Sequence, residues 1–256
     1  MKIEQKGKGR KMKDKRLNRD IIKYMAMLTM LLNHIGNVLM KGDTWLRTAF
    51  IDIGYFTAIT MCYFLVEGYQ YTRSKRKYAK RLAWFAVLSQ IPFCLALSEG
   101  TIIRSQRFNM FYTLLLCFGI VYVYDRMTEL ERRKRYLIVL FLLSAFGDWA
   151  FIAPIFTVFF VEANNDRNLL KIAYVKSIAI FWLINFLTYV GQYDLLQTLI
   201  RSTSSTLGVA LSAVVILYCY NGKRMEKGKV VSKWFFYLFY PVHLLILGLI
   251  RIGMMR

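Results

Sequence analysis

The chain has 256 residues, of which 57% are hydrophobic and only 20% are charged, and its mean hydropathy is +0.37. A soluble domain does not need so much apolar material. The aromatic content of 16% excludes a disordered chain, and four cysteines that lie in apolar runs without a Cys-x-x-Cys pair exclude a secreted disulfide scaffold. The formal net charge of +21 is compatible with nucleic-acid binding, so the placement of the charges decides what it means.

Nine apolar runs follow one another along the chain. They cover residues 21–40, 48–69, 82–98, 108–124, 136–148, 150–163, 172–190, 204–219 and 234–252. Because a membrane-spanning helix needs about 20 residues, these runs predict an all-α, polytopic integral membrane helical bundle of about nine transmembrane helices. The runs at 136–148 and 150–163 are short and almost adjacent, so they are either two spans or one re-entrant hairpin.

Basic residues gather in alternate connections between these runs. Segments 1–20, 70–81, 125–135, 164–171 and 220–233 carry 27 Lys and Arg residues, whereas the other connections and the C-terminal end carry 7. This positive-inside bias predicts a multi-pass protein of the plasma membrane with its N-terminus in the cytoplasm and its C-terminus outside. The charge is therefore a topology determinant, and nucleic acid is not needed as a partner.

Two regions of different character follow from this pattern. Residues 1–20 are expected to form a basic cytoplasmic tail that lies against anionic lipid headgroups, ahead of an uncleaved signal anchor. Residues 21–256 are expected to form a single transmembrane domain in contact with membrane lipid.

Ionisable residues inside transmembrane helices are energetically expensive and therefore indicate functional sites. The only two histidines, His34 and His243, both lie in predicted spans. Lys23 precedes His34 by eleven residues, which at 100° per residue places both on one helix face, about 16 Å apart along the axis, with Met27 and Met30 between them. This stripe is either a polar channel face or a snorkelling lysine beside a histidine that is bonded to a neighbouring helix.

The other polar residues of the spans allow similar alternatives. His243 follows Pro241, which is expected to kink its helix, and Tyr240 shares the histidine face. Glu67 lies at the depth of Lys23, so it either pairs with that lysine or acts as a catalytic carboxylate.

Several polar residues are expected near the outer ends of the helices, where they would line a vestibule: Asn33, Asn37, Asp52, Asn109 and Asp148. Asp148 follows Gly147 and is also a typical turn residue. Two histidines and scattered carboxylates have no metal-ligand spacing, so no metal is predicted.

Six short motifs occur in order between about residues 19 and 250. They lie at 20–23 with 32–36, 64–68 with 72–73, 89–93, 111–115, 220–224 and 235–243. Together they resemble the TraX family of polytopic membrane proteins, which is related to the wider acyltransferase-3 group. The spacing from Lys23 to His34 matches the first-helix signature of that group, in which an arginine is usual at the first position.

This resemblance implies a single acyltransferase-like transmembrane domain. The implied reaction is acetyl transfer from cytoplasmic acetyl-CoA, as donor substrate with no bound cofactor, to an amine or hydroxyl of a membrane or envelope acceptor. In the namesake members the acceptor is the N-terminal amine of a conjugative pilin, and relatives in the wider group modify envelope glycans. A pilin-like peptide or a cell-envelope glycan is therefore the expected partner.

The implied site has catalytic and substrate-binding parts. His34 is the expected general base, since an imidazole near neutral pH suits that role. Two further catalytic residues are expected, His243 and Glu67. The expected substrate-binding residues are Lys23 and Arg73, supported by Lys80 and Arg81, at the acetyl-CoA, Tyr240 at the intermediate, Asn33 at the His34 ring, and Asn109 and Asp148 on the outer side.

The chain also departs from the family pattern. Asn33 and Gln90 stand where many members have acidic residues, Cys94 stands where another acidic residue follows, and Tyr55 and Ile59 replace a common Arg and Pro. Either the acceptor differs or catalysis is impaired.

Two other classes of function remain open on the residues alone. The same His, Lys and Glu residues suit a transporter or channel pathway, although the chain lacks the inverted repeat typical of many transporters. A non-catalytic membrane scaffold is the third possibility.

Overall fold

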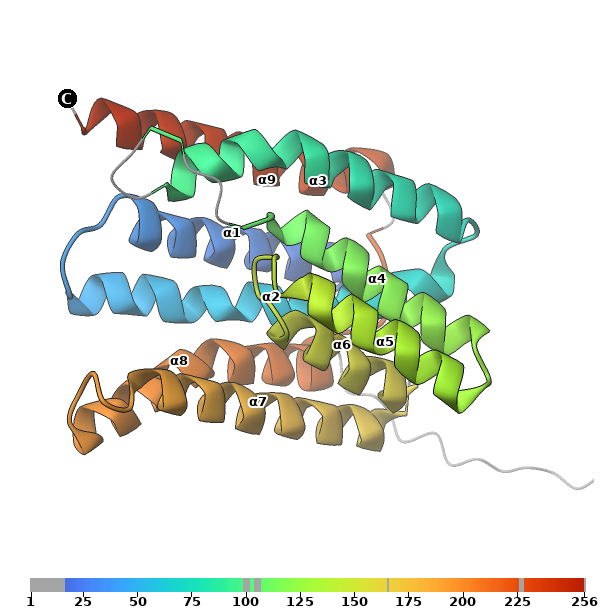
Figure 1. The fold of residues 1–256 in the computed structure, drawn as a ribbon. Helices are drawn as coiled ribbons and strands as arrows, with labels where there is room; N and C mark the ends of the chain where they lie inside the picture. Colours follow the sequence, from blue (N-terminus) through green and yellow to red (C-terminus); the bar gives the residue numbers. More distant parts are fainter. Residues whose placement is uncertain (1–16, 99–101, 104–106, 165, 226–227, 256) are drawn as a thin grey trace, which may run out of the picture.

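The computed structural model describes residues 17–98, 102–103, 107–164, 166–225 and 228–255. The predicted all-α architecture is confirmed in this part of the chain (Figure 1), which folds into α1 (Arg19–Val38), α2 (Trp45–Tyr71), α3 (Lys75–Leu97), α4 (Met110–Arg126), α5 (Leu130–Ser144), α6 (Ile152–Ala163), α7 (Arg167–Tyr189), α8 (Leu195–Val214) with the π-helical turn η1 (Val215–Cys219), and α9 (Lys229–Gly253). Most of the basic tail, residues 1–16, lies outside the described residues.

Within the described residues, five helices are long and apolar enough to cross a membrane: α2, α3, α7, α8 with η1, and α9. Their number and composition make this a helical membrane protein. Most helices begin several residues before the apolar runs; the first turns of α3, α5 and α7, for example, carry charged residues but are still helical. Side-chain caps define several of these starts; Asn18 accepts hydrogen bonds from the backbone N–H groups of Asp20 and Ile21, and Asp166 does the same at α7.

The helices α5 and α6 form the hairpin that the sequence left as one of two alternatives. With 15 and 12 residues they are about 22 and 18 Å long, less than the bilayer core of about 30 Å. Their connecting turn meets the start of α4, where Phe108 N–H donates to Phe146 O and Asp148 N–H donates to Phe108 O, both at 2.7 Å. In Figure 1 this turn lies part-way along the bundle, which is the arrangement expected of a re-entrant hairpin.

The helices lie in layers around a central pair. In Figure 1 α1 and α2 run through the middle, α3 and α9 cover one side, and α7 and α8 cover the other. We call the end at which α1 and α3 begin the basic end, because it carries Arg19, Arg73, Lys77, Arg81 and Arg224.

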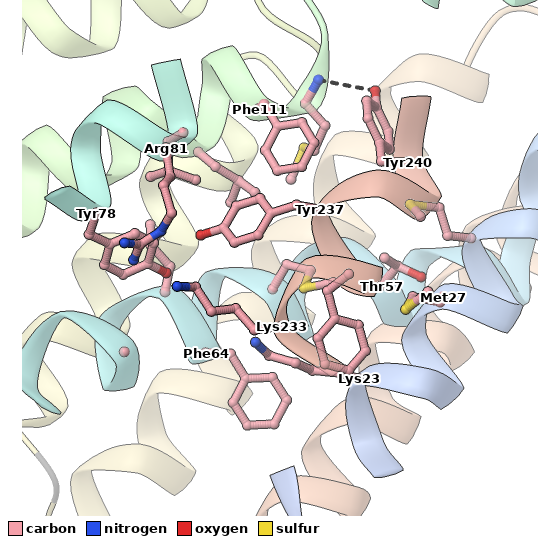
Figure 2. Close-up of a pocket in the computed structure, with 18 of the residues that line it drawn as sticks. Lys23, Met27, Thr57, Phe64, Tyr78, Arg81, Phe111, Lys233, Tyr237 and Tyr240 are labelled. Carbon is pink, nitrogen blue, oxygen red and sulfur yellow. Dashed lines mark hydrogen bonds between the residues drawn. The ribbon is translucent and has the colours of Figure 1, made fainter. Parts of the chain in front are cut away.

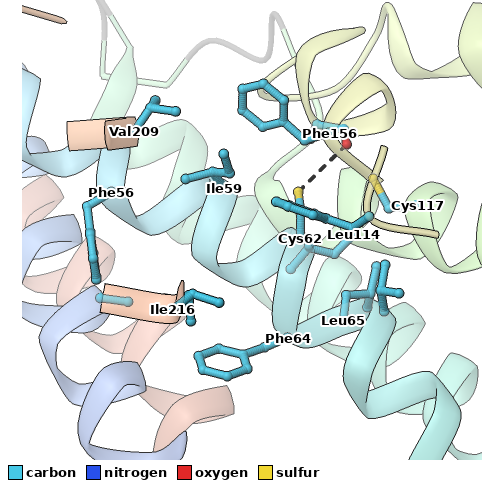
Figure 3. Packing of buried hydrophobic residues seen from close by; sticks show 14 of the residues in the cluster. Phe56, Ile59, Cys62, Phe64, Leu65, Leu114, Cys117, Phe156, Val209 and Ile216 are labelled. Carbon is cyan, nitrogen blue, oxygen red and sulfur yellow. Dashed lines mark hydrogen bonds between the residues drawn. The ribbon is translucent and has the colours of Figure 1, made fainter. Parts of the chain in front are cut away.

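The core forms around α2. Figure 3 shows Phe56 and Ile59 of α2 beside Val209 and Ile216 of α8 and η1, and Cys62 of α2 beside Phe156 of α6. Cys62, Cys94 and Cys117 are buried and unpaired, as expected for small apolar residues.

Small residues allow the central helices to approach closely. A Cβ on Gly208 would lie 2.3 Å from Asp52 O, and a Cβ on Gly54 would lie 2.2 Å from the Cβ of Asn33. Hydroxyl groups bridge the same interfaces, such as Thr60 to Ser212 at 2.8 Å. These contacts are typical of helices that pack inside a membrane, where close van der Waals contact replaces the hydrophobic effect.

Candidate functional site

One cavity of about 510 Å³ runs from the basic end into the bundle, between α1, α2, α3, α4 and α9. At the basic end it is lined by seven cationic side chains: Arg19, Lys23, Arg73, Lys77, Arg81, Arg224 and Lys233. Its middle is lined mainly by apolar side chains, among them Met27, Met30, Met61, Phe111 and Leu114. Its deep end is lined by Asn33, His34, Gly54, Asp148, Trp149 and Tyr240. The cavity therefore changes along its length from cationic to apolar to neutral polar.

Helical spacing explains this gradient. On α1 the lining residues Lys23, Met27, Met30 and His34 are three or four positions apart, so they share one face as the sequence predicted. The α2–α3 corner gives the same spacing to Arg73, Lys77 and Arg81, and α9 gives it to Lys233, Tyr237 and Tyr240. Three faces thus meet around one passage.

Lys23 lies inside this passage at its cationic part. Its Nζ is 5.0 Å from the ring centroid of Phe236 and 5.8 Å from that of Phe64 (Figure 2). Nearby, the Arg81 guanidinium lies 5.5 Å from the Tyr78 ring. Cation–π contacts of this kind hold a charge where few carboxylates are present. Lys23 is therefore a lining residue of the cavity and not a lysine that snorkels to the lipid interface.

The two histidines contact each other. His34 Nδ1 lies 2.7 Å from His243 Nε2, and His243 Nδ1 lies 2.7 Å from the backbone oxygen of Phe239. A carbonyl oxygen only accepts hydrogen bonds, so His243 Nδ1 carries a proton. In the neutral pair His243 Nε2 is then the acceptor, and His34 Nδ1–H is the donor. This leaves His34 Nε2 with a free lone pair.

The cavity lining distinguishes the two rings. Both side chains are buried, with 8% and 5% exposed, but only His34 lines the cavity. His243 stands behind it and orients it. The expectation that Asn33 holds the His34 ring is wrong, because Asn33 Nδ2 donates to Ile51 O at 2.8 Å and His243 takes that place.

Tyr240 and Asp148 complete the deep end. The Tyr240 ring centroid lies 6.2 Å from that of His34, and its hydroxyl accepts a hydrogen bond from Met110 N–H at 3.3 Å. Asp148 lies in the α5–α6 turn, where Thr113 Oγ1 donates to its backbone oxygen at 2.5 Å. The re-entrant hairpin thus brings a carboxylate to the same end of the cavity as the imidazole.

The same turn has an unusual backbone. Trp149 has φ of +57° and Phe151 has φ of +60°, a left-handed region that bulky residues rarely adopt. Each such residue costs on the order of 1–3 kcal/mol, and such residues are concentrated at functional sites.

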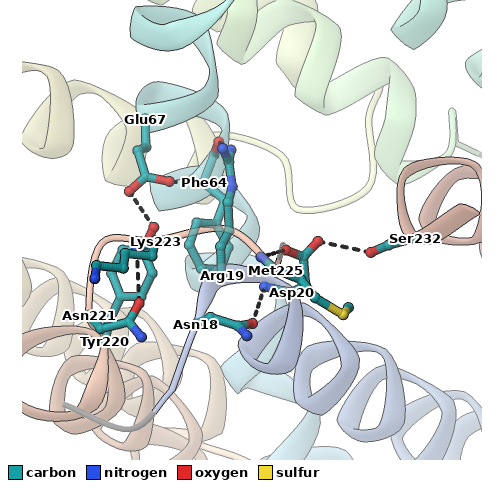
Figure 4. Close-up of polar contacts among 10 residues, drawn as sticks. All are labelled: Asn18, Arg19, Asp20, Phe64, Glu67, Tyr220, Asn221, Lys223, Met225 and Ser232. Atoms are coloured by element: carbon teal, nitrogen blue, oxygen red, sulfur yellow. Dashed lines mark hydrogen bonds and ion pairs between the residues drawn. The ribbon is translucent and has the colours of Figure 1, made fainter. Parts of the chain in front are cut away.

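Glu67 does not line the cavity. Its Oε2 lies 3.3 Å from Arg19 Nε, and its Oε1 accepts a hydrogen bond from the Tyr220 hydroxyl at 2.7 Å (Figure 4). The ion pair expected with Lys23 is therefore made with Arg19, whose Nη2 also donates to Phe64 O at 3.0 Å. We infer that this carboxylate has a structural role, and its catalytic role stays a prediction without geometric support.

Residues 17–20, 219–225 and 228–232 form a clasp at the basic end. Arg19 N–H donates to Lys223 O at 2.9 Å, and the Asp20 carboxylate accepts from Met225 N–H and from Ser232 Oγ, both at 2.8 Å (Figure 4). Because Arg224 and Lys233 lie within or beside this clasp, it places them at the cavity mouth. The motifs at 20–23 and 220–224 contain Asp20, Lys223 and Arg224, but the sequence does not show that these two motifs meet.

Asn109 and Lys80 also lie outside the cavity lining. Asn109 caps α4, and its Nδ2 donates to Ala86 O at 2.6 Å and to Gln90 Oε1 at 2.8 Å, so it joins α3 to α4. Lys77 lines the cavity instead of Lys80. The four-residue spacing from Arg73 is the sequence signal that identifies it.

Known proteins resemble this chain over nearly its whole length. The sequence model of the family described as "TraX protein" matches residues 18–251. A protein of Dichelobacter nodosus named "Probable fimbrial assembly protein FimC, serogroup H1" is 25% identical over 238 residues, which are 88% of this chain and 92% of that protein. No solved structure matches. The matched range contains every residue that lines the cavity.

The buried ion pair predicts a stability effect. Replacing Glu67 by Gln keeps the acceptor for Tyr220 but leaves the Arg19 charge without its partner, so the free energy of unfolding in detergent is expected to fall by about 3 kcal/mol. The matched control is Glu131→Gln, because the Glu131–Lys134 pair is exposed and contributes less than about 1 kcal/mol. Equal stability losses in the two variants would show that Glu67 does not hold the clasp.

Proposed function

Because this chain belongs to the TraX family, we propose that it is a membrane-embedded acetyltransferase that uses acetyl-CoA. The observation that carries the proposal is a continuous cavity that joins seven cations at one end to the Nε2 of a buried imidazole at the other. A site for transfer from a polyanionic donor needs both parts in one passage.

The donor fits the gradient of the lining. The phosphates of acetyl-CoA bind among the cations of the basic end, since charge-assisted hydrogen bonds to phosphate are the strongest available there. The uncharged pantetheine arm passes the methionines and aromatic rings of the middle. The helical rise from Lys23 to His34 is about 16 Å, a distance that an extended pantetheine arm can span, and this supports a position of the thioester beside the imidazole.

The chemistry then needs one base at the deep end. His34 Nε2 removes the proton from an acceptor amine or hydroxyl. At the same time the nitrogen or oxygen of the acceptor attacks the thioester carbonyl. The tetrahedral intermediate collapses with formation of an amide or ester and cleavage of the carbon–sulfur bond, and the leaving thiolate of CoA takes the proton from His34. His243 stabilises the imidazolium through the hydrogen bond to Nδ1, and Tyr240 lies close enough to orient the intermediate.

The acceptor reaches the deep end, where Asp148 offers a counter-charge to an ammonium group. A pilin-like peptide N-terminus or an envelope glycan remains the proposed acceptor class. The name of the Dichelobacter nodosus relative, a fimbrial assembly protein, favours the peptide.

The charge distribution supports one orientation in the membrane. We place the basic end in the cytoplasm, where acetyl-CoA is made, and the C-terminus outside, in the plasma membrane. The arginines and lysines of that end support this orientation through the positive-inside bias.

Replacing His34 by Ala removes the proposed base. Acetyl transfer, or hydrolysis of acetyl-CoA by the purified protein in detergent, is expected to fall at least 100-fold while the protein still inserts and remains monodisperse. Asn37→Ala is the matched control, because Asn37 lies one turn further along α1 and does not line the cavity. Wild-type turnover in folded His34→Ala protein would refute the base, and absence of turnover in the wild type would favour a transporter or scaffold.

Replacing Lys23 by Ala removes one cation from the proposed phosphate site. The KM for acetyl-CoA is expected to rise about tenfold or more, with a smaller change in kcat, because a charge-assisted contact to the donor is lost. Lys80→Ala serves as the control, since Lys80 is a lysine of the same end that does not line the cavity. If both variants bind acetyl-CoA like the wild type, the donor does not enter through this mouth.

A further inference from the structure

We propose that Trp149 is the end wall of the acyl site and limits the donor to short acyl chains. The inference rests on the proposed function, because it concerns the acyl group of the same thioester. Trp149 lines the cavity at the turn between α5 and α6, at the end where His34 lies.

A chain of contacts places the indole beyond the imidazole. Its ring centroid lies 5.7 Å from that of Tyr55, the neighbour of Gly54. Gly54 in turn packs on Asn33, which directly precedes His34; a Cβ on Gly54 would lie 2.6 Å from the Asn33 amide nitrogen. The space beside the His34 imidazole would hold the thioester carbonyl. This space is therefore closed by Trp149, Gly54 and Asn33.

The indole is held on its other side as well. It stacks on Phe181 of α7 with a centroid distance of 5.8 Å and an angle of 7° between the ring planes. Two helices, α2 and α7, thus support the ring from outside the cavity. A ring packed on both sides cannot easily rotate away to admit a longer chain.

The turn that carries Trp149 is equally well fixed. Asp148 N–H donates to Phe108 O at 2.7 Å, and Phe151 N–H donates to Ser144 Oγ at 3.2 Å. The backbone of Trp149 has a positive φ, a conformation that glycine would adopt without strain. Trp149 is bulky, its backbone is strained, and its ring lines the cavity. This combination points to a role in shaping the cavity.

The experiment uses the full chain in detergent and compares Trp149→Gly with the wild type. Glycine accepts the positive φ, so the turn is kept while the wall is removed. The probes are acetyl-CoA, butyryl-CoA and hexanoyl-CoA, with affinity measured by calorimetry and turnover by chromatography of released CoA. We expect the wild type to prefer acetyl-CoA over hexanoyl-CoA and Trp149→Gly to reduce this preference about tenfold or more.

Phe151→Gly is the matched control. Phe151 also has positive φ in the same turn, but it is 44% exposed and does not line the cavity. Relief of backbone strain is common to both variants, whereas removal of the wall belongs to Trp149→Gly alone. An unchanged acyl preference in folded Trp149→Gly protein, or an equal shift in Phe151→Gly, would overturn the proposal.

The two readouts separate this proposal from the proposed function. Chain-length-dependent binding without turnover in the wild type would contradict acetyl transfer and would still test the wall through affinity. Turnover with no change of preference in Trp149→Gly would contradict the wall and leave the transferase intact. Failure of the wild type to bind any of the three thioesters would overturn both.

Discussion

The hydrogen bond between His34 and His243 is the interaction on which the rest of the site depends. It joins α1 to α9 in a buried place where an unpaired imidazole nitrogen would be costly. The carbonyl of Phe239 fixes the proton on His243, and this fixes the proton on His34 in turn. The neutral pair can thus present only one free nitrogen to the cavity, that of His34. A lone histidine on α1 would have no such restriction.

The cations at the basic end are the second constraint, because seven positive side chains around one passage repel each other. The structure offsets this repulsion with few carboxylates, Glu67 on Arg19 and Asp20 on the clasp, and with aromatic rings beside Lys23 and Arg81. The lining therefore keeps a large excess of positive charge at its mouth. Such a surface suits a polyanion that enters and leaves, since each phosphate lowers the repulsion when it binds.

Much of this arrangement could be predicted from the sequence. Apolar runs located the helices, and the period of 3.6 residues placed Lys23, Met27, Met30 and His34 on one face, which lines the cavity. Contacts between distant segments could not be predicted, because helical periodicity reports a face and not its partner. For that reason the pairing of His34 with His243, 209 positions away, was missed. The positive φ of Trp149 and the re-entrant turn also depend on packing against α4 and α7, which no local pattern reports.

The most direct test of the account is the proton position on the two imidazoles. The chain has only two histidines, so ¹⁵N-histidine labelling of the full protein in detergent gives signals from two rings alone. Both rings are expected to be neutral, with the proton on Nδ1 and each Nε2 unprotonated. A proton on Nε2 of either ring, whether as the other tautomer or as an imidazolium, would contradict the assignment of His34 as the base.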